Sequence, residues 1–242
     1  MSTRTVPRLP RRRFFVGMAG LAIAVALAGF SKTFFLPLAR GTFVPLPAAY
    51  VHAALMFSWL LLFALQASLI RMRAHALHRK LGWLGVALAA GIAWSTVAMG
   101  VQAMQRDALL HPGPGAASSL VGNCTAMLGF VAMVFAGACY RRRPDVHKRL
   151  MMLATIGVLW PAWFRFRHFF PSVPFPEWVF AILAADSLVL VLAWHDWRTF
   201  GRVHRVTAWV GGALITDHVV ETLAFDSAGW RVLANGLARA LA

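Results

Sequence analysis

The sequence predicts an all-α polytopic membrane protein, a bundle of seven transmembrane helices. Of its 242 residues, 60% are hydrophobic and only 13% are charged, and the mean hydropathy is +0.66. Apolar runs recur along the chain at close to the roughly 20 residues that a helix needs to cross a hydrocarbon core. The formal net charge of +16 does not indicate a nucleic-acid partner, because the basic residues fall in short clusters between apolar runs. The expected partner is the lipid bilayer.

The seven predicted helices form one transmembrane bundle over residues 1–242, with no soluble domain between them. In order they cover residues 14–38, 50–70, 81–104, 120–140, 150–166, 177–194 and 206–225. The first is expected to be a retained span because its apolar run resumes at Phe34. The alternative is a cleaved signal segment, of ordinary or twin-arginine type, that ends after Ala28. The second, third and fourth are apolar for about 20 residues or more.

The last three predicted helices carry polar or aromatic markers. The fifth lies within "RPDVHKRLMMLATIGVLWPAWFRFRHFF", whose polar residues gather at its two ends. We expect Asp145 to be the N-cap of this helix and Pro161 to kink it. The sixth is short, but Trp178 and Trp197 bracket it as interfacial anchors. The seventh carries a polar group around His218 in an otherwise apolar run.

The distribution of basic residues predicts that the N-terminus is inside and the C-terminus outside. With this orientation the cytoplasmic segments hold 17 of the 24 lysines and arginines, namely five before the first helix, four after the second, five after the fourth and three after the sixth. Seven remain for the other side, so the positive-inside rule favours this topology. The expected location is the inner, or plasma, membrane of a bacterium.

An internal repeat marks the three cytoplasmic turns. They end in "ALHRKLGWLGVA", "DVHKRLMMLATI" and "RVHRVTAWVGGA", each with a histidine beside a basic residue: His78, His147 and His204. One interpretation is that these histidines merely tolerate the headgroup region. However, only 9 of 242 residues are histidine, and all three turns place one at the same point, which weakens that interpretation and leaves a functional role open.

A second polar set is predicted at the outer side of the membrane. Its members are Lys32, His52, Arg165, Arg167, His168, His218 and Glu221, with Asp186 and Asp217 near mid-membrane. An ionisable group within a span costs about 2.5–3.5 kcal/mol, so it normally faces a cavity or a partner. One interpretation is a set of buried ion pairs, with Glu221 as the counter-ion of Lys32 or Arg165, together with side chains that snorkel to the headgroups. The other is an outer pocket with a proton or redox path.

One spacing favours haem. His204 and His218 are 14 residues apart, which puts them on one helix face about 21 Å apart. A bis-histidine haem b needs a second imidazole at the same depth. That ligand would be His52 or His168 on the outer side, with His52 and His218 as candidate ligands of the iron, and His147 or His78 on the inner side.

Short motifs add a resemblance to known membrane proteins. "YVHAALMFSWLLLFALQASLI" followed by "HRKLGWLGVALAAG" resembles the opening helices of the ascorbate-reducible transmembrane cytochromes b. With "RRRPDVHKRLMMLATIGVLWPAWFRFRH", the pattern resembles uncharacterised bacterial multi-pass proteins and, more loosely, membrane factors for haem-copper oxidase assembly. The resemblance implies that His52 and His78 are cytochrome-like ligands. The predicted topology places them at opposite membrane faces, so they would not bind one haem together.

Three functions are therefore expected. The first is a redox component that holds b-type haem and exchanges electrons with a quinol. The second is a non-catalytic assembly or binding protein whose outer cationic pocket holds an anionic headgroup or a partner subunit. The third is a small-solute or proton transporter that uses Asp186, Asp217 and Glu221.

Overall fold

The computed structural model describes residues 11–42, 45–110, 113 and 115–241, with side chains from Arg13 onward. Residues 1–10, which include Arg4 and Arg8 of the basic N-terminal segment, lie outside the described part of the chain. The described chain is helical with short turns and contains no strand. The predicted all-α class is therefore confirmed for these residues.

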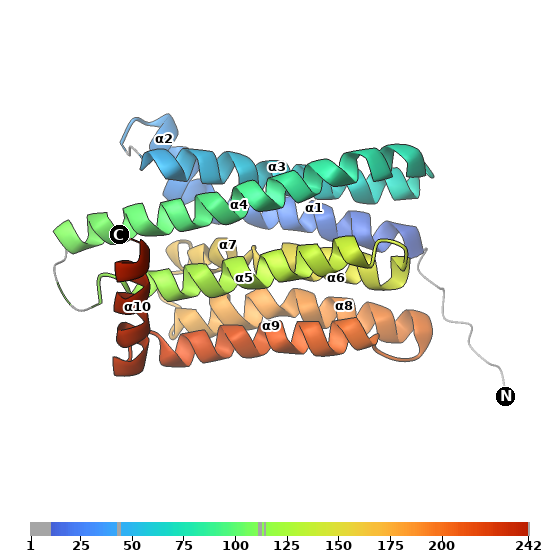
Figure 1. Ribbon diagram of the computed structural model, residues 1–242. Helices are drawn as coiled ribbons and strands as arrows, with labels where there is room; N and C mark the ends of the chain where they lie inside the picture. Colours follow the sequence, from blue (N-terminus) through green and yellow to red (C-terminus); the bar gives the residue numbers. More distant parts are fainter. Residues whose placement is uncertain (1–10, 43–44, 111–112, 114, 242) are drawn as a thin grey trace.

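The long helices lie side by side along one direction, and the last helix lies across one end of them (Figure 1). In order they are α1 (Arg11–Phe30), the π-helical turn η1 (Ser31–Phe35), α2 (Leu36–Ala39), α3 (Pro47–Arg71), α4 (His75–Leu110), α5 (Ser118–Cys139), α6 (Pro144–Gly157), α7 (Trp160–Phe164), the 3₁₀ turn η2 (Arg165–His168), the π-helical segment η3 (Glu177–Ala184), α8 (Ala185–Phe200), α9 (Arg205–Ala224) and α10 (Ala228–Leu241).

Among the described residues, five helical segments are long and apolar enough to cross a membrane. They are Arg13–Ala39, Pro47–Arg71, His75–Leu110, Ser118–Cys139 and Glu177–Phe200. The fifth predicted span is divided, because the α-helix stops at Gly157 and resumes at Trp160. The seventh, α9, is less apolar because it contains Asp217, His218 and Glu221. The structure thus shows a multi-pass membrane character with five such segments.

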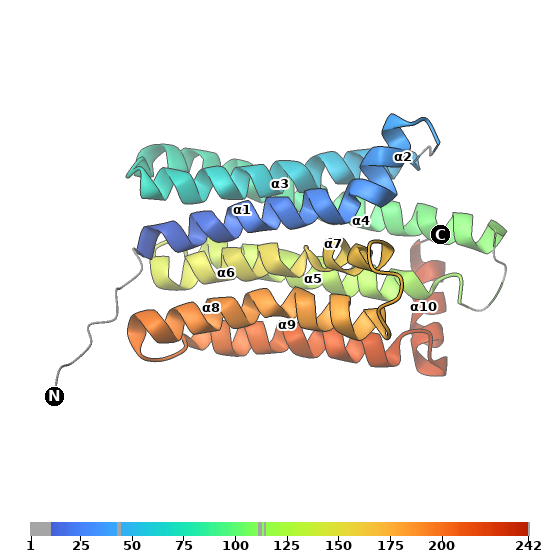
Figure 2. The same cartoon turned by 180° about the vertical axis from the view of Figure 1, so that it is seen from behind.

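The ends of the bundle differ. The turns α3–α4, α5–α6 and α8–α9 lie at one end together with the start of α1, whereas α10 lies across the other end (Figures 1 and 2). The three repeated histidine motifs therefore share one end of the molecule. The extra helix α10 was not predicted, because it is short and amphipathic and lies outside any long apolar run.

The structure corrects two expectations for the fifth helix, its N-cap residue and the position of its interruption. Arg143 rather than Asp145 occupies the N-cap position, and its side chain makes no cap hydrogen bond. Pro144 occupies the first turn, where its fixed φ suits a helix start, so Asp145 falls inside that turn. The interruption comes before Pro161, because proline lacks the N–H that would continue the helical ladder.

Close packing in the bundle core sets the distance between helices. Trp59 of α3 lies against Phe130 of α5 and donates its indole N–H to Thr155 of α6 over 3.2 Å. Gly29 of α1 lies directly against the backbone of Ala162 in α7, where any Cβ atom would collide with the Ala162 carbonyl. This contact holds α1 and α7 together beside the cavity described next.

Candidate functional site

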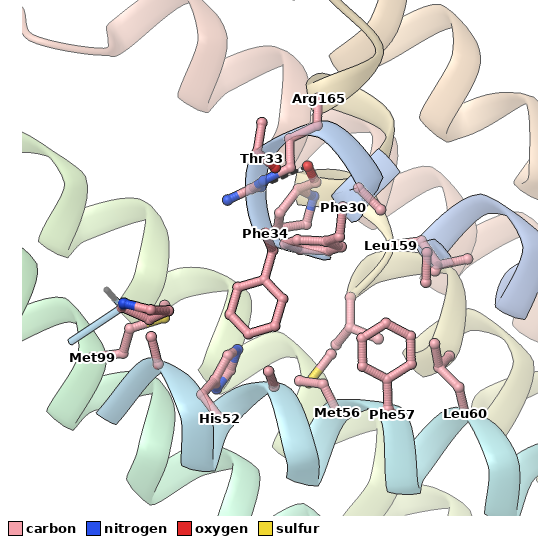
Figure 3. A pocket seen from close by; sticks show the side chains of 17 residues that line it. Phe30, Thr33, Phe34, His52, Met56, Phe57, Leu60, Met99, Leu159 and Arg165 are labelled. Atoms are coloured by element: carbon pink, nitrogen blue, oxygen red, sulfur yellow. Dashed lines mark hydrogen bonds between the residues drawn. The ribbon is translucent and has the colours of Figure 1, made fainter. Parts of the chain in front are cut away.

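A cavity of about 220 Å³ opens between α1, η1, α3 and α7, at the bundle end opposite the histidine-bearing turns. Most of its lining is aromatic or aliphatic: Phe30, Phe34, Met56, Phe57, Leu60, Met99 and Leu159, with small alanines between them. Figure 3 shows His52, Met56 and Phe57 on α3, facing Phe34, Thr33 and Arg165 across the cavity. Polar side chains from three segments thus converge on an apolar space.

His52 is held by a short hydrogen-bond chain to α4. Its Nδ1 lies 3.1 Å from Ser95 Oγ, and Ser95 donates its own hydroxyl proton to the Ile92 carbonyl over 3.0 Å. Because that proton is used, Nδ1 of His52 is the donor and Nε2 carries the lone pair. On the other side of the cavity, the buried Oγ1 of Thr33 has no hydrogen-bond partner among the described residues.

Arg165 is positioned by the turn that follows Pro161. Its Nη1 donates to the Pro161 carbonyl over 2.8 Å, and its guanidinium lies 4.3 Å from the centre of the Phe30 ring. The cation is thereby fixed by a backbone carbonyl and an aromatic face, neither of which neutralises its charge.

Two further basic groups lie beside Arg165. Lys32 donates to the His168 carbonyl over 3.1 Å and lies 4.4 Å from the Phe169 ring centre. Arg167 lies 3.8 Å from the ring centre of Phe164. Within the described parts of the chain, none of these cations forms an ion pair with a carboxylate; the pairs found there are Arg106–Asp107, Arg149–Asp196, His204–Asp145, His218–Asp186 and Arg231–Asp226. Arg165 therefore brings an uncompensated positive charge to the wall of the cavity.

The predicted outer acids have other partners. His218 Nδ1 lies 2.7 Å from Asp186 Oδ1, and both side chains are buried. Glu221 accepts a short hydrogen bond from Thr125 of α5, so it is not the counter-ion of Lys32 or Arg165. The structure thus places the outer residues in two groups: a cationic group at the cavity, and an acidic group on α8 and α9 that includes Asp217.

No family model, curated protein or solved structure matches this chain. Within the described residues, no group of three or more histidine, cysteine, aspartate or glutamate side chains is arranged to hold a metal ion.

The candidate haem ligands are distributed differently from the expected sets. His204 accepts from the backbone N–H of Val206 and lies 3.3 Å from Asp145, and His218 is paired with Asp186. Among the described histidines, only His78 and His147 have rings next to each other. His52 lies beside Ser95, 17 residues along α4 from His78, so it is roughly 25 Å from His78 along the helix axis.

A buried polar cluster at the other end of the bundle was missed from the sequence. Arg149 of α6 pairs with Asp196 of α8, and Thr207 of α9 donates to the same carboxylate over 2.6 Å. Arg149 and Asp196 are essentially inaccessible to solvent. Asp196 could have indicated this cluster, because an acidic residue is unusual at a cytoplasmic helix end where basic residues predominate.

Proposed function

We propose that this chain is a seven-span inner-membrane binding protein, with its N-terminus inside and its C-terminus outside, and that its cavity holds an anionic amphiphile. The apolar part of the ligand lies between α1, α3 and α7, and its carboxylate or phosphate meets the guanidinium of Arg165. The observation that carries this proposal is the unneutralised Arg165 at the wall of an apolar cavity.

The division of the lining into apolar and cationic parts supports the ligand class. Phe30, Phe34 and Met56 offer no hydrogen bonds, so they suit an alkyl chain or a ring. A guanidinium binds carboxylate and phosphate groups through two parallel hydrogen bonds. The volume of about 220 Å³ is below the range of about 300–1,000 Å³ for drug-sized sites, so a single chain fits better than a two-chain lipid.

The seven-span topology is supported by the course of the remaining helices. The combined segment α6–α7 and the helix α9 run alongside the five apolar segments (Figures 1 and 2). With the histidine-bearing turns in the cytoplasm, this topology puts the cavity in the outer half of the membrane.

Binding of a fluorescent single-chain fatty acid to the purified protein tests this function. Arg165→Gln should weaken binding by about 10- to 100-fold, since a hydrogen bond to a charged group contributes about 1.5–3 kcal/mol. Arg167→Gln is the matched control: its guanidinium is close by but does not line the cavity. Equal losses in the two variants would indicate general electrostatic attraction and contradict a specific site.

Binding of a neutral quinone analogue distinguishes the proposed function from the quinol-linked redox function. If the guanidinium selects the ligand, the fatty acid should bind more tightly than the quinone, and the preference should disappear in Arg165→Gln. A quinone that binds better in both proteins would favour the quinol-linked function over the one proposed.

Proton transport is the second candidate, and one observation favours it. Asp186 is buried and bonded to His218 through Oδ1, while its Oδ2 atom has no partner among the described residues. An intramembrane acid–histidine pair is a common component of proton relays. Proton flux in vesicles that is abolished by Asp186→Asn and unaffected by Arg165→Gln would support this function.

A further inference from the structure

His78 and His147 come from different hairpins, yet their imidazole rings are neighbours at the end of the bundle opposite the cavity. The ring centres are 6.2 Å apart and the ring planes are nearly perpendicular, at 89°. His78 lies in the first turns of α4, and His147 lies in the first turn of α6. The proposed ligand cavity uses neither residue.

A backbone carbonyl orients His147. Its Nδ1 lies 2.8 Å from the carbonyl oxygen of Gly137 in α5. A carbonyl can only accept, so Nδ1 carries the proton and Nε2 presents a lone pair. Histidines that bind metals through Nε2 are commonly held in this way, because the bond fixes both the tautomer and the orientation of the ring.

The His78 ring also meets a backbone group, that of Gln66 in the adjacent helix α3, but its buried Nδ1 atom makes no hydrogen bond within the described chain. The buried Oε1 atom of the Gln66 side chain has no partner there either. Buried polar atoms without a partner are uncommon, and a missing ion or ligand is one of their explanations. His78 and His147 as whole residues are only partly buried, so the pair lies near the surface of this end of the bundle.

We propose that His78 and His147 together ligate one transition-metal centre. A metal–imidazole bond is about 2 Å long, and each nitrogen lies about 1 Å from its ring centre. Two imidazoles on opposite sides of one metal therefore have ring centres about 6 Å apart, close to the observed 6.2 Å. Imidazole nitrogen suits copper and iron.

The surroundings restrict the metal further. Arg79 follows His78 and acts on it electrostatically, so the local positive charge opposes a dication bound by two neutral ligands. A monovalent copper ion, or haem b with its anionic propionates, is more compatible with this charge. Among the described residues, no third histidine, cysteine or carboxylate completes the site, so the proposed centre has two protein ligands.

Metal titration of the full-length protein in detergent tests the proposal in two arms. In one, monovalent copper competes with a chromophoric chelator; in the other, haem is added and low-spin absorption bands are followed. One equivalent of copper or one equivalent of haem should bind per protein. His78→Ala and His147→Ala should each weaken that binding by at least about 100-fold, since even outer-shell partners of a metal contribute about 10- to 100-fold.

The control is His75→Ala, an exposed histidine on the same end of α4, which should leave binding unchanged. His147→Gln retains an N–H donor for the Gly137 carbonyl, so a folded but metal-free variant separates ligation from folding. X-ray absorption should show nitrogen ligands at copper, or the spectrum should show six-coordinate iron. Absence of binding in both arms, or binding that survives both alanine variants, would overturn the proposal.

Discussion

The guanidinium of Arg149 and the carboxylate of Asp196 form a buried ion pair that joins α6 to α8. Arg149 Nε lies 3.1 Å from Oδ1 and 3.0 Å from Oδ2. The side chains are 1% and 0% exposed, so water cannot replace either partner. Thr207 Oγ1 and the backbone N–H of His204 also donate to Oδ2, over 2.6 Å and 3.3 Å. One carboxylate therefore connects α6, α8 and the start of α9.

We expect Asp196→Asn to destabilise the protein by about 3–5 kcal/mol, because it leaves the Arg149 charge buried without a counter-ion. The double variant Arg149→Met/Asp196→Leu should recover much of this loss, since an apolar pair of similar size needs no desolvation of charge. Unfolding in mixed detergent and SDS measures both changes. A double variant no more stable than Asp196→Asn would contradict this explanation.

Gly29 should be intolerant of substitution. A Cβ atom there would overlap the Ala162 carbonyl, and a backbone atom cannot move aside as a flexible side chain can. Gly29→Ala should therefore cost about 1–3 kcal/mol and separate α1 from α7 beside the cavity. Gly20→Ala on the same helix meets no atom within 4 Å and is the control. Equal thermal stability of the two variants would show that the contact is not tight.

Docking of α10 should depend on acid pH. Asp226 accepts from Ser118 Oγ over 2.6 Å and from Arg231 Nε over 2.9 Å. The hydrogen bonds from Arg231 and Ser118 lower the pKa of Asp226 from 3.8 to about 2. Because the folded-state pKa is lower than the unfolded-state value, this stabilisation is present above about pH 4 and is lost as the pH falls toward 2.

A spin label at Leu233→Cys, in a background without Cys124 and Cys139, reports this docking. Its mobility should rise as the pH is lowered from 4 to 2. Asp226→Asn should show the mobile state already at neutral pH. An immobile label in Asp226→Asn would mean that α10 is held by Trp230 and Ala234 without the ion pair.

Fusion reporters test the proposed topology. A reporter active only in the cytoplasm should be active when fused near Arg73, Arg142 or Arg202, because these turns carry the basic residues. The same reporter fused after Ala242 should be silent. Reporter activity at the C-terminus would contradict a topology of seven spans with the N-terminus inside.

Hydropathy was sufficient to predict the helical class. A backbone in lipid must satisfy its hydrogen bonds internally, so long apolar runs become helices. Hydropathy could not reveal α10, because an amphipathic helix at the end of a bundle has no long apolar run. Nor could it place the break at Val158 and Leu159, where the helix stops before Pro161.

Pairings between helices were beyond the sequence. His52 and Arg165 were both expected at the outer level, and the structure brings them to one cavity. However, Glu221 bonds to Thr125 instead of a cation, and His78 lies beside His147. Such contacts depend on which helices are neighbours and how they are rotated. Hydrophobic periodicity does not specify either when most faces of a helix are apolar.

Photo-crosslinking with a diazirine-bearing fatty acid tests the central claim most directly, because it locates the apolar chain. Adducts should concentrate on the α3 peptide that contains Met56 and Phe57. Ala53→Phe, which fills the cavity, should remove them, whereas Ala54→Phe, at the adjacent exposed position, should not. Adducts spread evenly over the exposed helix faces, or unchanged in Ala53→Phe, would contradict binding in the cavity.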